Sequence, residues 1–93
     1  MKIGILGTGD VGQRLGSGFA ALGHDIKMGT RDPKSEKVKA WLAKNRPRAS
    51  AGTFAESAAF AELAILATAW SGTENAIRLA NPKNFAGKIV IDT

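Results

Sequence analysis

The sequence of 93 residues suffices for one small domain, and its 44% hydrophobic and 23% charged residues are ordinary for a globular protein. It has no cysteine, a single histidine (His24) and no apolar run of about 20 residues, which excludes disulfides, thiolate chemistry, a histidine metal cluster and a membrane span. The net charge is +5, and the segment from Lys27 to Arg48 holds eight basic against two acidic residues, which favours an anionic partner.

The N-terminal part predicts a strand, a helix and a second strand. Residues 2–6 are mostly apolar and run into glycine, which indicates a buried strand, and no secretory segment precedes them, so we expect a cytoplasmic protein. The large apolar residues Val11, Leu15, Phe19 and Leu22 then recur at spacings of four, four and three, which predicts a helix over residues 11–22. Gly23 should end this helix, and residues 25–28 should form the second strand.

The next segment predicts a second helix that starts just after Asp32. Aspartate is a favourable N-cap, and Pro33 fits the first helical position because its missing N–H needs no partner there. The inner face of this helix is predicted to contain Val38, Trp41 and Leu42, so Trp41 is expected in the core. The helix should end before Pro47.

Three more strands are predicted, at residues 49–52, 63–67 and 88–92. Two helices should separate them, each opened by a capping box, the first made by Thr53 with Glu56 and the second by Ser71 with Glu74. Strands that alternate with helices must be parallel, since a hairpin cannot join parallel neighbours. We therefore predict one α/β domain over residues 1–93, a doubly wound parallel five-stranded Rossmann sheet of order 3-2-1-4-5 with helices on both faces.

The six residues that follow the first strand are Gly7, Thr8, Gly9, Asp10, Val11 and Gly12, which match the pattern G-x-G-x-x-G between a strand and a helix. In this context Gly7 permits a tight turn, and Gly9 lets a pyrophosphate approach the backbone. Gly12, with Gly16 one turn later, lets the helix pack closely on the first strand. The free N–H groups at the helix start would hold the phosphates. The alternative is a purely structural turn.

The end of the second strand indicates which dinucleotide binds. Domains that prefer NAD place a carboxylate there, which accepts hydrogen bonds from the adenosine ribose, whereas this chain has Thr30 and Arg31. A guanidinium and a hydroxyl suit a 2′-phosphate, and Lys34, expected in the first turn of the next helix, could add a further positive charge. The pattern therefore predicts NADP(H), although Arg31 and Lys34 as plain surface cations are the alternative.

Residues after the fourth strand complete the predicted cofactor site. The segment Ala67, Thr68, Ala69 and Trp70 lies across the switch point from the glycine loop, and its small residues would leave room for the nicotinamide half. Trp70 would form a wall of that pocket or simply pack beside a helix start. No metal ligand set and no catalytic acid or base is nominated.

Taken with these residues, the chain resembles the N-terminal domain of NADP-dependent oxidoreductases that reduce the deazaflavin coenzyme F420, and the cytoplasmic part of related ferric metalloreductases. The matching segments cover nearly the whole chain, at residues 3–12, 22–25, 29–31 and 66–70. The resemblance implies that residues 8–11 line the diphosphate, that Thr30 and Arg31 hold the 2′-phosphate, and that a basic residue near Lys34 assists. It also implies a further C-terminal substrate or dimerisation domain in the reductases themselves.

The favoured function is NADP(H) binding within a hydride-transfer oxidoreductase, where the cofactor carries the redox chemistry and the protein orients it. The electron acceptor stays open, deazaflavin or another, and we expect this chain alone to bind NADPH without turnover. A non-enzymatic nucleotide-binding or interaction module is the alternative, and nucleic-acid binding through the basic segment is less favoured because aromatic residues are scarce there. Pairing along the fifth strand would allow a homodimer.

Overall fold

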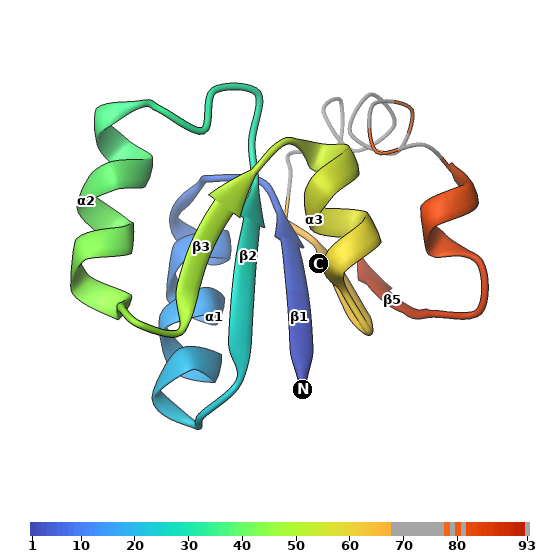
Figure 1. Ribbon diagram of the computed structural model, residues 1–93, viewed down its shortest axis with the longest axis horizontal. Helices are drawn as coiled ribbons and strands as arrows, with labels where there is room; N and C mark the ends of the chain where they lie inside the picture. The colour runs from blue at the N-terminus through green and yellow to red at the C-terminus, as the bar shows by residue number, and fades with distance from the viewer. Residues whose placement is uncertain (68–77, 79, 81, 93) are drawn as a thin grey trace.

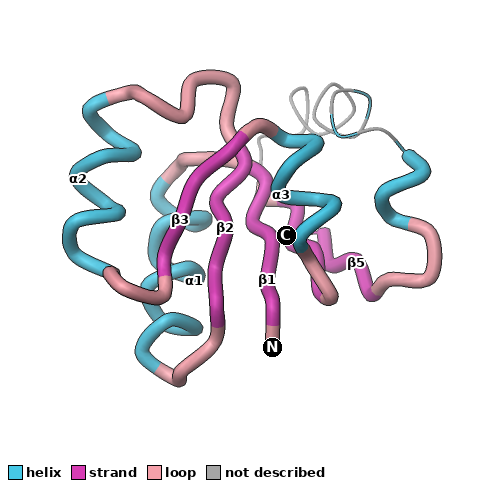
Figure 2. Tube along the Cα trace, viewed as in Figure 1, coloured by secondary structure: helices cyan, strands magenta, loops and turns pink. Residues whose placement is uncertain are grey.

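Five parallel strands form one sheet in the order β3-β2-β1-β4-β5 in the computed structural model, which describes residues 1–67, 78, 80 and 82–92. The strands are β1 (Lys2–Leu6), β2 (Asp25–Gly29), β3 (Ala49–Gly52), β4 (Leu63–Leu66) and β5 (Ile89–Asp92). They lie side by side in Figure 2. The predicted α/β class, strand order and strand positions are confirmed, each strand lying within one residue of its predicted bounds.

Helices cover both faces of this sheet. Figure 1 shows α3 (Phe54–Phe60) on the near face, while α1 (Asp10–Ala21) lies on the far face and contacts α2 (Glu36–Asn45). A short 3-10 helix, η1 (Pro82–Phe85), precedes β5, and the predicted capping box of Ser71 and Glu74 lies outside the described residues. Within the described ranges, no helix has both the length and the apolar character needed to cross a membrane.

The core on the α1 face is built from alternate strand residues. Side chains at every second position of a strand point to the same face, and here they are β-branched or flexible apolar residues. Ile3, Ile5, Ile26, Met28 and Ile65 are all at most 2% exposed and pack together beneath α1 and α2. Burial of each such side chain stabilises the fold by about 1.5–3 kcal/mol.

The opposite face has a smaller core under α3. It joins Leu6 and Leu66 of the sheet to Phe54 and Ala58 of the helix. A close approach is required, since a Cβ added to Gly29 would lie 2.9 Å from the Cβ of Ser57, and one added to Gly4 would lie 2.5 Å from the Ser57 carbonyl oxygen. The buried Ser57 hydroxyl donates to the carbonyl of Lys27 at 2.8 Å, which satisfies the one polar group that this packing encloses on α3.

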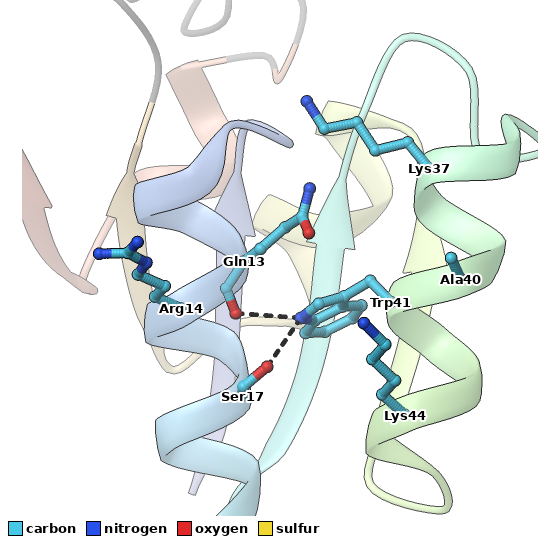
Figure 3. A pocket seen from close by; sticks show the side chains of 7 residues that line it. All are labelled: Gln13, Arg14, Ser17, Lys37, Ala40, Trp41 and Lys44. Atoms are coloured by element: carbon cyan, nitrogen blue, oxygen red, sulfur yellow. Dashed lines mark hydrogen bonds between the residues drawn. The ribbon is translucent and has the colours of Figure 1, made fainter.

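Trp41 fastens α2 to α1. Its indole is 3% exposed, and Nε1 donates to the Gln13 carbonyl at 3.0 Å and to the Ser17 hydroxyl at 3.1 Å (Figure 3). The predicted core position of Trp41 is therefore confirmed. Gly16 makes room for this ring, since a Cβ there would lie 2.5 Å from Trp41 Cζ2, whereas Ile5 of β1 would be 3.3 Å away. The expected role of Gly16 in packing on β1 is thus the weaker of its two contacts.

The boundaries of α1 agree with prediction, but the start of α2 does not. Gly23 follows α1 with φ of 92°, a left-handed conformation that ends the helix. The helix α2 starts three residues later than predicted, with Ser35 rather than Asp32 as its N-cap, and the Ser35 hydroxyl accepts from Val38 N at 3.3 Å. Asp32 instead closes a turn, since its carboxylate accepts from Lys34 N at 3.1 Å and its carbonyl accepts from Ser35 N at 3.1 Å.

Candidate functional site

All five strands are parallel, so their carboxyl ends lie at one edge of the sheet, where Gly7, Thr30 and Ala67 directly follow β1, β2 and β4. In Figure 1 the arrowheads of β1, β2 and β3 point to the upper edge. Backbone hydrogen bonds hold this edge together. Gly7 N donates to the Gly29 carbonyl at 3.0 Å, and Ala67 N donates to the Leu6 carbonyl at 2.9 Å. The first residue of the loop after β1 is therefore fixed to the end of β2, and the end of β1 is fixed to the residue that follows β4.

The loop between β1 and α1 has the conformation that its glycines permit. Gly7 has φ of 126°, which a residue with a side chain rarely adopts. A Cβ added to Gly12 would lie 2.8 Å from the Gly7 carbonyl oxygen, whereas its distance of 3.4 Å from Ile5 Cγ2 of β1 is an ordinary van der Waals contact, so Gly12 mainly allows the loop to close. The structure therefore supports the predicted tight turn at Gly7, whereas close packing on β1, the predicted role of Gly12, is its weaker contact.

Gly9 differs from these two because nothing lies within 4 Å of a Cβ built on it. Its φ of −71° is open to any residue, so neither backbone strain nor packing explains a glycine here. Gly9 is the N-cap of α1 and supplies no capping side chain, and the first helical hydrogen bond runs from Gln13 N to Gly9 O. The N–H groups of the first turn, from Asp10 to Gly12, thus precede the helical ladder at its positive end.

The end of β2 presents a hydroxyl and a guanidinium. Thr30 is 7% exposed, its N–H donates to the Gly52 carbonyl at 3.0 Å, and its hydroxyl oxygen accepts from Asp32 N at 3.2 Å. The Thr30 hydroxyl hydrogen remains able to donate to another acceptor. Arg31 is exposed and makes no ion pair within the described residues. A buried, oriented hydroxyl and an exposed guanidinium thus lie next to each other at the end of β2.

A hollow of about 320 Å³ joins these two residues to the start of α3, and its lining is Thr30, Arg31, Thr53 and Phe54. The sequence predicted Thr53 only as a helix cap and did not place Phe54 in the site. The predicted strand order would have indicated this contact, because β3 pairs with β2 and the last residue of β3, Gly52, lies beside Gly29. Residues that follow neighbouring parallel strands meet at the same sheet edge.

The capping box of α3 fixes Thr53 and the start of the helix, which line the hollow opposite Thr30 and Arg31. Thr53 Oγ1 accepts from Glu56 N at 3.1 Å, and Glu56 Oε1 accepts from Thr53 N at 2.9 Å, as predicted from the spacing. The hydrogen bonds that the Glu56 carboxylate accepts from Thr53 lower its pKa, and the charge of Lys27 lowers it further. The hydrogen bonds at the start of α3 therefore favour the ionised carboxylate of Glu56 over its protonated form.

Lys34 does not lie in the helix, which corrects its predicted place. It is an exposed residue of the turn between Arg31 and Ser35, two residues before the start of α2 at Glu36. The reason is the turn at Asp32, which uses the aspartate that would otherwise have capped the helix. Lys34 does not line the hollow beside Arg31.

The segment after β4 is described only at its first residue. Ala67 is 9% exposed and would lie 3.3 Å from a Cβ on Gly12, so it stands at the switch point between β1 and β4. Thr68, Ala69 and Trp70 lie outside the described residues.

A second hollow, of about 440 Å³, lies between α1 and α2, and two lysines of the basic segment, Lys37 and Lys44, line it. Arg14, Lys37 and Lys44 line it together with the residues around Trp41 (Figure 3). The glycine loop and Arg31 do not contribute to it. Because the Trp41 ring is buried, this hollow exposes no aromatic face on which a nucleic-acid base could stack.

Comparison with known proteins identifies the family to which this sequence is similar. The family model for coenzyme F420-dependent NADP oxidoreductases matches residues 2–93. The chain belongs to this family. The resemblance to F420-dependent NADP oxidoreductases, which was stated from the glycine loop and the Gly29–Arg31 element, is thereby confirmed.

A solved structure agrees with this family assignment. The structure is of a protein from Arthrobacter sp. FB24, assigned as an F420-dependent NADP reductase, and its TM-score to this chain is 0.90 at 38% sequence identity. The match covers 99% of this chain and 44% of the Arthrobacter chain, so this family member spans less than half the length of that relative. Among curated proteins, none matches the sequence of the 93-residue chain.

Proposed function

We propose that this chain binds NADP(H) along the carboxyl edge of its sheet and prefers NADP(H) to NAD(H). The observation that carries the proposal is the end of β2, where Thr30 and Arg31 border one hollow and no carboxylate stands in their place. An NAD-specific site needs an acceptor for the ribose hydroxyls at that point, whereas a 2′-phosphate needs donors. Arg31 offers a planar pair of N–H donors, and the Thr30 hydroxyl offers one more.

The diphosphate would lie over residues 8–11, on the backbone of the glycine loop. Three features support this position: the open space at Gly9, the absence of a capping side chain, and the N–H groups at the positive end of α1. Asp10 adds a negative charge to the first turn, so the backbone N–H groups rather than side-chain charge would hold the phosphates. The residues present therefore fit a dinucleotide.

The remaining parts of the cofactor are assigned by position. Lys34, exposed in the turn after Arg31, would add positive charge near the 2′-phosphate. Ala67 stands beside Gly12 at the switch point, and we assign the nicotinamide half to the segment from Ala67 through Thr68 and Ala69 to Trp70. The small side chain of Ala67 leaves room there.

In its family the chain would serve hydride transfer between NADP(H) and an acceptor, with a deazaflavin as the proposed acceptor. The cofactor supplies the hydride chemistry when bound, and the role of this chain is to hold and orient it. We assign no acid, base or metal to the reaction. Residues 1–93 would act as the NADP-binding domain of such an oxidoreductase, with the acceptor held by further protein elements.

Calorimetric titration of the chain with NADPH and with NADH tests the proposal. Hydrogen bonds to a charged phosphate contribute about 1.5–3 kcal/mol, so NADPH should bind about 10- to 150-fold more tightly than NADH. Equal affinities would contradict the proposed role of the β2 end, and no binding of either dinucleotide would contradict the proposed function as a whole.

A further inference from the structure

Gln13, in the first turns of α1, is bonded twice to the loop that precedes the helix. Its backbone N–H donates to the Gly9 carbonyl at 3.0 Å, which is the first hydrogen bond of the helix. Its side-chain Nε2 donates to the Thr8 carbonyl at 2.8 Å. One residue thus holds the two successive carbonyl groups with which the loop enters the helix.

Contacts with α2 hold Gln13 itself in place. The Gln13 carbonyl accepts from Trp41 Nε1 at 3.0 Å, and the same Nε1 donates to Ser17 Oγ at 3.1 Å. Figure 3 shows the side-chain amide of Gln13 pointing away from the Trp41 ring. Gln13 is half-buried between the two helices, so its side chain loses less rotamer freedom on bonding to the loop than a fully exposed glutamine would.

The peptide unit that joins Thr8 to Gly9 has little else to fix its orientation. Gly7 N is bonded to the Gly29 carbonyl, but nothing lies within 4 Å of a Cβ built on Gly9. Turning the peptide unit over would bring φ of Gly9 from −71° to a positive value, which glycine adopts as readily as a negative one. The glycine that leaves space for a ligand therefore also leaves this peptide unit able to turn.

The orientation of this peptide unit decides which group it presents to a ligand. The unit is trans, so its C=O and N–H bonds point in opposite directions. Because the Thr8 carbonyl is bonded to Gln13, the Gly9 N–H points away from Gln13, and no described residue accepts from it. This N–H can donate to a phosphate oxygen alongside the first turn of α1. The reversed unit would present the negative end of a carbonyl, which repels phosphate.

We infer that Gln13 is a positioning residue of the diphosphate loop, whose side-chain amide keeps the Thr8–Gly9 peptide unit turned with its N–H toward the ligand. The inference rests on the proposed function, since it takes the diphosphate to lie over residues 8–11. Gln13 acts through the Thr8 carbonyl and not by contact with the cofactor. Trp41 contributes by fixing the backbone of Gln13, so the packing of α2 on α1 also supports the loop.

Gln13→Met tests this role, because methionine keeps the length and the helix propensity of glutamine but has no donor. A net hydrogen bond corresponds to about a 2- to 12-fold change in affinity. NADPH and NADH both contain the diphosphate, so both should bind the variant more weakly by this factor in calorimetry. Adenosine 2′-monophosphate carries the 2′-phosphate without the diphosphate, and NMR titration should show that it binds variant and parent equally.

Ser17→Ala is the matched control. Ser17 lies one turn after Gln13 in α1, lines the same hollow and accepts from Trp41, but it has no hydrogen bond to the loop. Its affinities for all three ligands should equal those of the parent. An equal fall in Ser17→Ala, or weaker binding of adenosine 2′-monophosphate to Gln13→Met, would show that Gln13 acts only through the packing of the two helices and would contradict the inference.

NMR of the ligand-free protein tests the peptide orientation separately from the proposed function. The Gly9 amide should give one sharp signal in the parent and in Ser17→Ala, whereas in Gln13→Met it should be broadened by microsecond-to-millisecond exchange. If the parent binds neither dinucleotide, the proposed function fails, while broadening confined to Gln13→Met still supports the hold of Gln13 on the loop. An unchanged Gly9 signal together with unchanged NADPH and NADH affinities in folded Gln13→Met would overturn the inference.

Discussion

The backbone N–H of Gly7 donates to the carbonyl oxygen of Gly29 at 3.0 Å, and this hydrogen bond joins the two halves of the proposed cofactor site. Gly7 starts the loop over which the diphosphate would lie, and Gly29 is followed directly by Thr30 and Arg31. The loop proposed to hold the diphosphate and the residues proposed to bind the 2′-phosphate are therefore held at a fixed separation before any ligand arrives. Such preorganisation reduces the conformational entropy lost on binding.

Gly9→Val should abolish dinucleotide binding without unfolding the protein. The space at Gly9 is empty and its φ suits valine, so the fold should tolerate the change, whereas the two added methyl groups would occupy the diphosphate position. We expect no NADPH binding in calorimetry up to about 1 mM ligand, with a urea midpoint close to that of the parent. Unaltered NADPH affinity in folded Gly9→Val would show that this loop does not contact the diphosphate.

Gly16→Ala should destabilise the protein, while Gly18→Ala should stabilise it, although the two glycines lie in the same helix. The added Cβ at Gly16 meets the Trp41 ring at 2.5 Å, and such overpacking costs about 1–3 kcal/mol. Gly18 is exposed with nothing within 4 Å, so alanine there gains about 0.5–1 kcal/mol of helix propensity. Urea unfolding of both variants measures the difference, and shifts of the same sign would refute the account of how α1 meets α2.

The Glu56 capping box should make stability depend on pH in the acid range. The pKa of Glu56 is lowered in the folded state from its ordinary value of 4.5, so its carboxylate stabilises the fold above that pH. This contribution is lost as the pH falls through the lowered folded-state pKa. Glu56→Gln keeps an acceptor but removes the titration. The difference in unfolding free energy between parent and variant should therefore shrink between pH 6 and pH 3, and a difference that is constant with pH would argue against the capping role.

The fold could be predicted from the sequence because its signals are local and repeated. Glycine after Leu6, Gly23 after α1 and the Thr53–Glu56 spacing each mark a boundary by a mechanism that acts within a few residues. The start of α2 could not be predicted this way, because Asp32 and Ser35 are both good N-caps. Which one caps the helix depends on the turn that Asp32 makes with Lys34.

The site was predicted less completely than the fold, for a related reason. Gly9, Thr30 and Arg31 belong to a pattern that is contiguous or nearly so in sequence. Phe54 joins them only because α3 starts beside the end of β2, which is a contact between distant parts of the chain. The tight fit of Gly16 against Trp41 is likewise a contact across 25 residues, and no spacing rule within one helix anticipates it.

The most direct test of the central claim compares NADPH and NADH binding to Arg31→Ala by calorimetry. Arg46→Ala serves as the matched control, since Arg46 is also exposed and follows the last residue of α2, away from the glycine loop. If Arg31 binds the 2′-phosphate, NADPH affinity should fall about 10- to 150-fold in Arg31→Ala, NADH affinity should change less than about twofold, and the control should match the parent. An equal fall for both dinucleotides, or no fall for NADPH, would contradict the assignment of this chain as an NADP(H)-preferring domain.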